Sequence, residues 1–296
     1  MLNGPRFLQI RRLGALIALA SLAACGCGNC TVPPFRSGPG VGVTPTPSPT
    51  PFLACNQGAS AIVLGPALAP FAVLAGSAVS NVGNTLVTYA PGAVTGGTND
   101  DLIGVWPGTS VTGFYPPGTD TDGTNAIYAA GYNANTAVPL AAQSALTVAY
   151  NTAALEPGAT SVAGDLGGLT LTPGVYKSTS TLLIASGNLT LNGLGNPQSV
   201  FIFQVGSSLT TVLNGSLGGN VILENGASAC NIYWQIGSSA TLGGATFYGN
   251  VFAYSSITIN AATFTGRALA GGSALGTGAV SIPIAAGSLI TNPGGQ

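Results

Sequence analysis

Seven carboxylates are the side chains with which this chain could do acid–base chemistry, and they are scattered along it. Hydrolases and lyases that act on polysaccharides bring two carboxylates together with a basic residue. Only the pairs Asp100/Asp101 and Asp120/Asp122 are close in sequence, and both lie in Gly-rich stretches typical of turns. The sequence therefore predicts no active site and no enzyme. The other acids are isolated: Glu156, Asp165 and Glu224.

The segment Asp120-Thr121-Asp122-Gly123-Thr124-Asn125 resembles part of a calcium-binding loop. Such loops present oxygen ligands at alternate positions and complete the shell with a distal Glu, which is absent here. A turn rich in Asp, Gly and Asn explains the same residues without any ligand. We favour the turn, and the sequence leaves open whether Asp120 and Asp122 bind calcium.

The cysteines give a second set of reactive side chains. Cys27-Gly28-Asn29-Cys30 has the spacing of half a zinc site, but the chain has no second Cys pair and no His. We therefore expect no metal and no cofactor. Disulfides in an oxidising compartment explain the cysteines better. Their pairing among Cys27, Cys30, Cys55 and Cys230 stays open, as does the alternative that Cys230 is a thiol in the core.

The N-terminus has the features of an export signal. Its apolar stretch, Leu13 to Ala20, is too short to span a bilayer. The residues Leu22-Ala23-Ala24-Cys25 resemble the bacterial lipoprotein box, in which cleavage exposes an acylated Cys. We predict a lipoprotein signal over residues 1–24 with the lipid on Cys25; a plain secretory signal is the alternative. The positive region ahead of it contains Arg6, Arg11 and Arg12.

Residues 25–56 are predicted to form a tether that follows the lipid. Thr44 to Pro51 alternates Pro with Thr or Ser, a pattern that excludes helix and sheet and favours an extended chain. We therefore predict an exported protein, lipid-anchored at the bacterial cell envelope on the outer membrane or cell surface, with secretion as the alternative. The folded domain is expected over residues 57–290, followed by a tail over residues 291–296.

Composition narrows the remaining functions. Only 13 of 296 residues are charged (6 basic and 7 acidic), so the basic surface that nucleic-acid binding needs is absent. Abundant Val, Ile, Thr and Gly with so few charges is typical of a sheet-rich domain.

Three stretches in the last hundred residues are variants of one pattern: Phe201 to Thr210, Ile232 to Leu242, and Val251 to Ile259. From the second to the third the offset is constant, since Ser239 and Ser256 are 17 residues apart, as are Thr246 and Thr263. Short β-type runs at a period of about 20 residues, broken by Gly, Asn and Ser, predict a β-solenoid.

A single helix is expected over about residues 137–155, with Thr136 as its N-cap and Glu156-Pro157-Gly158 as its end. The strands Phe201 to Gln204 and Ile232 to Gln235 are apolar on both faces, so we expect the helix to pack on them. Its own apolar stripe consists of Ala142, Leu146, Ala149, Tyr150 and Ala153.

Seven runs of the sequence match one known family: Phe71–Ser77, Pro107–Phe114, Leu171–Lys177, Leu189–Gly193, Val200–Gln204, Ala229–Leu242 and Gly266–Ala270. Together they resemble the microbial ice-binding protein family of the discontinuous β-solenoid type. The similarity extends from about Ala67 to Ile284, in the family's order and with its helix. It implies a mainly β fold: a right-handed, three-sided discontinuous β-solenoid with one long α-helix packed alongside, completed by N-terminal strands.

The resemblance implies that the partner is an ice crystal surface and that the protein is a monomer. Strands ~4.7–4.9 Å apart come close to an oxygen repeat of ice, so a flat, uncharged face of small side chains could order an ice-like water layer. Strand alternation places Leu209, Ala240, Leu242, Ile257 and Ile259 inward. The outward candidates for ice binding are Thr210, Ser239, Thr241, Thr246, Ser256, Thr258, Asn260, Thr263 and Thr265.

Some family members carry Thr-(Ala or Gly)-X-(Thr or Asn) on the ice-binding face. Here Gly243 to Thr246 and Asn260 to Thr263 each lack the first Thr, while the matching Thr95-Gly96-Gly97-Thr98 falls in an insertion. Tyr248 is expected to roughen the face. These departures predict weak or moderate ice activity, or its loss. The alternative function is a cell-surface adhesin or structural lipoprotein with the same fold, which the regularity of the exposed ladders distinguishes.

Overall fold

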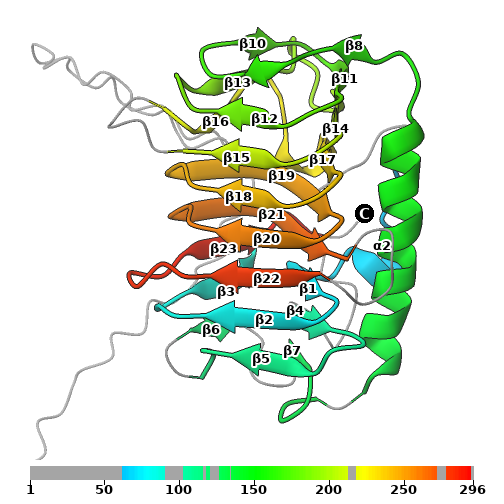
Figure 1. The fold of residues 1–296 in the computed structure, drawn as a ribbon, viewed down its shortest axis with the longest axis vertical. Coiled ribbons are helices and arrows are strands. Elements are labelled where there is room, and N and C mark those ends of the chain that lie inside the picture. Colours follow the sequence, from blue (N-terminus) through cyan, green and yellow to red (C-terminus); the bar gives the residue numbers. More distant parts are fainter. Residues whose placement is uncertain are drawn as a thin grey trace, which may run out of the picture. The chain divides into compact units, whose positions relative to one another are not determined.

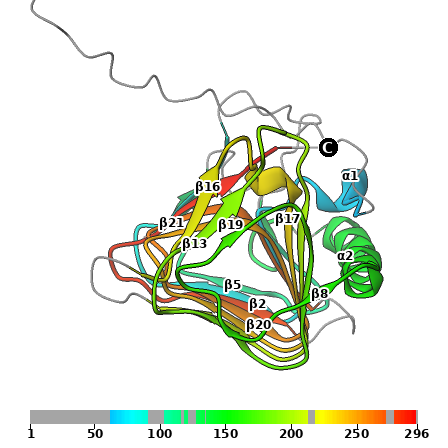
Figure 2. The same ribbon diagram turned by 90° about the horizontal axis from the view of Figure 1, so that it is seen from above.

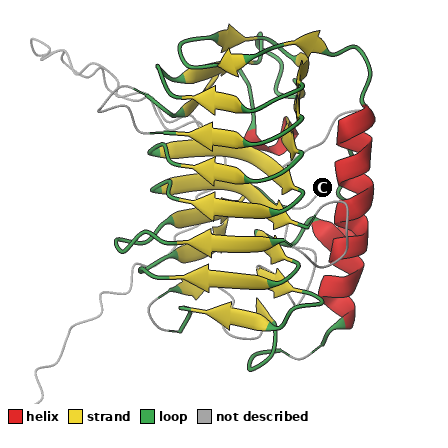
Figure 3. Ribbon diagram, in the orientation of Figure 1, coloured by secondary structure: helices red, strands yellow, loops and turns green. Residues whose placement is uncertain are grey.

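The structure is a computed structural model that describes residues 62–90, 103–115, 118–120, 127–133, 135–212, 218–271 and 278–294. Every strand pairing in these residues is parallel, and the strands stack into coils with one long helix beside them (Figures 1 and 3). Seen along the stack, each coil has three sides (Figure 2). Buried apolar side chains fill the interior. The predicted fold class, a mainly β three-sided solenoid with one long helix, is confirmed.

The first side, called the ladder side below, is one unbroken parallel sheet of eight strands. Each strand comes from a different coil, so the sheet runs along the described stack (Figure 1). In spatial order its strands are β5 (Ser110–Thr112), β2 (Ala78–Asn81), β22 (Ala279–Ile282), β20 (Ser256–Ile259), β18 (Ala240–Leu242), β15 (Leu209–Thr211), β12 (Leu182–Ile184) and β9 (Gly164–Asp165).

The second side, called the helix side, carries the helix on its outer surface. Its strands are β8 (Thr160–Ser161), β11 (Gly174–Ser178), β14 (Phe201–Val205), β17 (Ile232–Ile236), the second halves of β19 (Thr246–Ala253) and β21 (Thr263–Ala270), then β1 (Val73–Ala75), β4 (Ile103–Val105) and β7 (Ile127–Tyr128).

The third side, called the split side, is divided between two sheets. A separate three-stranded sheet, β10-β13-β16, lies at one end, and the first halves of β19 and β21 begin the other part. The strands that complete it are β10 (Thr170–Leu171), β13 (Leu189–Asn192), β16 (Val221–Glu224), β23 (Leu289–Asn292), β3 (Leu86–Tyr89) and β6 (Thr119–Asp120).

Strands β19 and β21 pass from the split side to the helix side around one corner, and a glycine marks the turn in each. Gly249 and Gly266 are paired in register and have φ values of 116° and 154°. A Cβ on Gly266 would lie 1.9 Å from the carbonyl oxygen of Gly249, so no side chain fits at this corner.

The stack is not continuous in sequence. After β20 and β22 the next strands in space are β2 and β5, which come from the N-terminal part of the domain. In the same way β23 pairs with β3, and β21 with β1. The N-terminal strands β1 to β7 therefore form one end of the stack. The chain then continues at the opposite end with β8, and its later coils lead back until β22 and β23 pair with β2 and β3.

Helix α2 (Ala137–Leu155) connects these two ends, since it follows β7 and precedes β8. Its 19 residues span about 28 Å, close to the roughly 33 Å of seven strand spacings. The predicted bounds and apolar stripe are confirmed, and the stripe packs against Ile202 and Tyr233 with the short helix α1 (Gly65–Leu68) nearby. Among the described residues, no helix is long and apolar enough to cross a membrane.

The expected N-cap needs a correction. Thr136 occupies the N-cap position, but its side chain makes no capping hydrogen bond. Instead the Oδ1 atom of Asn135 accepts a 3.2 Å bond from the backbone N–H of Ala137. The first turn is thus capped by the residue before the predicted one.

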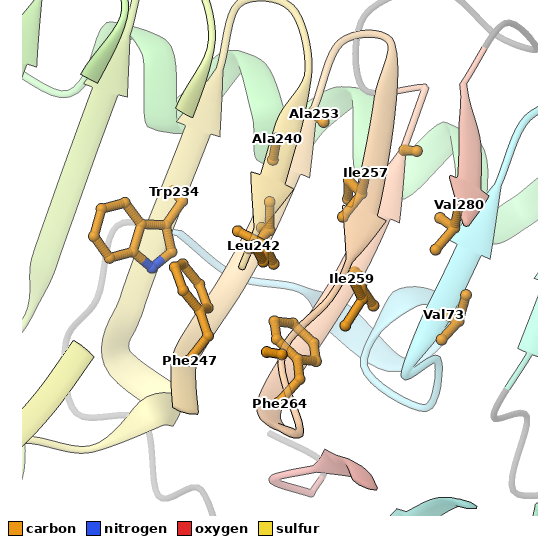
Figure 4. Close-up of a cluster of buried hydrophobic side chains, with 14 of the residues drawn as sticks. Val73, Trp234, Ala240, Leu242, Phe247, Ala253, Ile257, Ile259, Phe264 and Val280 are labelled. Carbon is orange, nitrogen blue, oxygen red and sulfur yellow. The ribbon is translucent and has the colours of Figure 1, made fainter. Parts of the chain in front are cut away.

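An aromatic column fills part of the interior. The Phe203 and Trp234 rings stack with centroids 3.9 Å apart, and the contacts continue to Tyr176 on one side and Phe247 on the other. Figure 4 shows Trp234, Phe247 and Phe264 beside the aliphatic side chains of the ladder side. The residues predicted to point inward are buried, as expected: Leu209, Ala240, Leu242, Ile257 and Ile259.

The expected end of the domain at residue 290 is too early. Strand β23 continues to Asn292, whose amide donates to the carbonyl oxygens of Ala69 (3.2 Å) and Pro70 (2.7 Å). Residues as far as Gly294 thus belong to the folded domain.

Candidate functional site

The outer surface of the ladder side carries two parallel rows of small side chains. Side chains alternate along each strand, so the middle residue of the three-residue strands β15 and β18 faces outward and its two neighbours face the core, and β20 alternates in the same way. The first row, called the threonine row, runs in register through Leu183, Thr210, Thr241, Thr258, Ser281, Ser80 and Thr112.

Three predicted residues form the centre of this row. Thr210 pairs with Thr241, and Thr241 pairs with Thr258, on three successive strands. All three are partly exposed. Among the described residues, none of their hydroxyls has a hydrogen-bond partner. Because a β-branched side chain in a strand has few χ1 options, each threonine presents a methyl and a free hydroxyl in a fixed direction.

The second row, called the serine row, lies two residues earlier on the same strands. It contains the predicted residues Ser239 and Ser256, and the Ser256 hydroxyl donates to Ser239 across 3.0 Å. Thr181 and Ser208 form a similar 3.0 Å hydroxyl pair. The hydroxyls of this row are therefore held mainly by each other, which keeps the surface low and regular.

Asn260 lies just past β20, at the edge of the ladder side. Its side chain is exposed, as predicted, and its backbone N–H donates to the carbonyl oxygen of Leu242. It flanks the threonine row and is not part of it.

The remaining three candidates lie on a different side. Thr246 and Thr263 pair with each other at the start of β19 and β21, on the split side. They are partly exposed but separated by a corner from Thr241 and Thr258. Tyr248 lies on this side too, beside Thr246 as expected, so its ring belongs to the split side and not to the ladder side.

The prediction that Thr265 faces outward is wrong. Only 5 % of this residue is exposed, so it cannot belong to a solvent-facing plane. It lies in register between Tyr248 and Thr291. Alternation indicated the face to which Thr265 belongs, but not what packs over it.

The ladder side is also nearly free of charge. Its outward positions hold one ionisable residue, Asp165, in the last strand of the sheet and in register with Leu183. Its carboxylate accepts bonds of 2.8–2.9 Å from the backbone N–H groups of Gly167, Ala185 and Ser186. Slight burial raises the pKa of Asp165, but these hydrogen bonds outweigh it and leave the pKa below its usual value.

The other chemical candidates lie elsewhere or outside the described residues. Cys25, Cys27 and Cys30 are outside them, as are Asp122 and the segment Thr95 to Thr98; the Asp120 side chain is not described. Within the described ranges, no three His, Cys, Asp or Glu side chains gather as metal ligands would.

Cys230 is described, and it is disulfide-bonded. The reading of Cys230 as a core thiol is therefore wrong. It lies in the short 3₁₀ helix η2 (Ala229–Asn231) before β17 and is 2 % exposed. The other four cysteines of the chain lie outside the described residues.

Residues 73–282 match the family model described as ice-binding-like. This range covers all strands of the ladder side. The chain belongs to the ice-binding-like family.

Individual members of the ice-binding-like family agree with this assignment. An ice-binding protein of Nostoc sp. is 41 % identical over 218 residues, 72 % of this chain and 71 % of the relative. Ice-binding protein 1 of Shewanella frigidimarina is 46 % identical over 131 residues, 42 % of this chain but only 14 % of that protein. A crystal structure of an ice-binding protein from an Antarctic biological consortium is 40 % identical and matches with a TM-score of 0.62, covering 78 % of this chain and 90 % of that chain.

Four of the seven residues in the threonine row of this family member, including Leu183, were not predicted from the sequence. Ser281 and Ser80 continue the row, and Thr112 ends it. Ser80 and Thr112 lie far upstream of the repeated segments, so their place depends on a pairing between distant parts of the chain. The run Phe71 to Ser77 matched the family and was the available signal that β2 joins the stack.

Proposed function

We propose that this protein binds ice through the outer surface of the ladder side, with the threonine row as the centre of the contact. The observation that carries the proposal is the register of Thr210, Thr241 and Thr258 on three neighbouring strands. Family membership supports the same function.

The physical basis is a match in spacing and polarity. Neighbouring strands place equivalent side chains ~4.7–4.9 Å apart, near an oxygen repeat of ice. Fixed hydroxyls can hold first-layer water, while the methyl groups leave that layer free of competing bonds. A row of charges would impose a different water order, and the two rows carry one ionisable residue, Asp165, at their end.

The ladder side is favoured over the other two because it is continuous and open. Helix α2 covers the helix side. The split side is divided between two sheets and carries Tyr248 beside its threonines. The ladder side is one continuous sheet of eight strands, so it fits a crystal surface best.

The mechanism is adsorption without a chemical step. Molecules bound to the crystal pin the growth front, so ice between them must grow with curvature, which lowers the freezing point locally. No group in this mechanism acts as an acid, base or nucleophile. A monomer suffices, because the complete ladder side belongs to one chain.

Thermal hysteresis and inhibition of ice recrystallisation test the proposal. Thr241→Tyr and Thr258→Tyr place a large ring on the ladder side and should abolish most of both activities. Thr263→Tyr is the matched control. Thr263 lies at the start of β21 on the split side, so this variant carries the same ring away from the ladder side. If the folded wild type shows neither activity, the alternative role of adhesin or structural lipoprotein gains support.

We also propose, from sequence alone, that the domain is held at a cell envelope by lipid on Cys25 and the tether over residues 25–56. Leu22-Ala23-Ala24-Cys25 and the Pro-rich run support this location. Labelling of cells with a fatty-acid analogue tests it: the wild type should be labelled and membrane-bound, and Cys25→Ala should be unlabelled. An unlabelled wild type found in the medium would support secretion instead.

A further inference from the structure

The threonine row has a break where the two ends of the domain meet. Strand β22 pairs there with β2, and the paired residues Ser281 and Ser80 are 201 positions apart in sequence. The serine row changes at the same place, since Ala279 pairs with Ala78. We call these four residues the seam. It contains no threonine, although Thr258 lies directly before it and Thr112 directly after it.

The hydroxyls of the seam are engaged with each other. Ser80 donates its hydroxyl proton to the Oγ atom of Ser281 across 3.3 Å. Ser80 therefore has no proton left for a water molecule on the surface. Thr210, Thr241 and Thr258 differ, because their hydroxyls have no partner among the described residues.

The seam also lacks the methyl groups that stiffen the row. A serine side chain can occupy any of three χ1 wells, whereas the branched Cβ of threonine restricts that choice. Ser80 thus lacks a free hydroxyl proton. Both Ser80 and Ser281 lack the methyl group and the restricted hydroxyl direction that a threonine would supply.

We infer that the seam limits the effective ice contact to the three-strand run Thr210–Thr241–Thr258 and isolates Thr112 from it. This inference rests on the proposed function and adds to it which positions set the strength of ice binding. The backbone at the seam keeps the same parallel register as its neighbours, so the interruption lies in the side chains.

Restoring threonine at the seam tests the inference. Ser80→Thr combined with Ser281→Thr extends the contiguous run from three threonines to six, and we expect thermal hysteresis to rise about two-fold. The matched control is Ser161→Thr, the same substitution at an exposed position in β8, outside the ladder side, where no rise is expected. Thermal unfolding of each variant shows whether the fold is retained.

The reverse change gives an independent test. Thr241→Ser introduces a seam-like position inside the run while keeping a hydroxyl, and we expect thermal hysteresis to fall about two-fold or more. An unchanged hysteresis in both the Thr241→Ser and the double Ser→Thr variants would overturn the inference. A folded wild type without hysteresis would instead overturn the proposed function, so the two failures are distinguishable.

Discussion

Arg267 and Asn250 lie 17 residues apart and are joined inside the domain by a 2.9 Å hydrogen bond from Nη1 to Oδ1. The same guanidinium donates through Nε to the carbonyl oxygen of Ala69 (2.9 Å) and through Nη2 to that of Gly294. One fully buried cation thus connects a neighbouring coil, the N-terminal segment and the C-terminal end of the domain. Its burial lowers the pKa of Arg267 to about 10, with Tyr233 and Tyr89 opposing the shift, so it stays charged at neutral pH.

Replacing Arg267 should lower the stability of the folded domain. Arg267→Met keeps most of the volume but leaves Asn250 Oδ1 and the Gly294 carbonyl oxygen without the Arg267 donor, while the Ala69 oxygen keeps only its bond from Asn292. We expect a loss of about 3 kcal/mol or more in the free energy of unfolding. Urea denaturation measures it. Lys177→Met is the control, because Lys177 is exposed and its loss should change stability little. Equal stability of the two variants would contradict the role given to Arg267.

The aromatic column should contribute strongly to stability, and Trp234 tests this. Trp234 stacks on Phe203, contacts Phe247, and donates from Nε1 to the carbonyl oxygen of Tyr248 across 3.1 Å. Trp234→Ala should lower the free energy of unfolding by about 3–5 kcal/mol through the cavity it leaves. Tyr254→Ala, at a side chain 40 % exposed, should cost far less in the same denaturation experiment.

A side chain at the corner glycines should destabilise the domain. Gly266→Ala forces a Cβ against the Gly249 carbonyl oxygen and should destabilise the domain by at least about 2 kcal/mol. Gly174→Ala is the matched control, since its Cβ would meet only the Tyr176 ring at 3.9 Å. The midpoint of thermal unfolding should drop for Gly266→Ala alone. A wild-type midpoint for Gly266→Ala would show that the corner can relax.

The lowered pKa of Asp165 should make the stability of the domain depend on pH. Its pKa is lower in the folded protein than in the unfolded chain, so its contribution to stability is present above the unfolded pKa of about 3.9 and is lost as the pH falls through the lower folded value. Asp165→Ala should therefore be less stable than the wild type at pH 7, with the difference shrinking toward pH 2. A difference that is constant with pH would rule out the carboxylate as its source.

Local pattern was enough for much of the fold. The 17-residue offset and the alternation of Leu209, Ala240 and Ile257 with outward hydroxyl residues predicted the repeating coils. The helix followed from its own periodicity and end signals. These features depend on residues close together in the chain, where spacing decides which side chains share a face.

The rest of the site depends on contacts between distant residues. Ser80 joins Ser281 only because the N-terminal strands complete the stack. Thr263 falls on another side from Thr258 because the chain turns a corner between them, and Thr265 is buried although alternation faces it outward. The break in the threonine row was therefore not visible in the sequence.

Incorporation into a slowly growing ice hemisphere tests the central claim most directly. The experiment compares fluorescently labelled wild type with Thr241→Tyr and Thr263→Tyr, all checked for folding by thermal unfolding. We expect the wild type and Thr263→Tyr to enter the ice and Thr241→Tyr to be excluded. Exclusion of the folded wild type, or equal incorporation of all three proteins, would contradict ice binding through the ladder side.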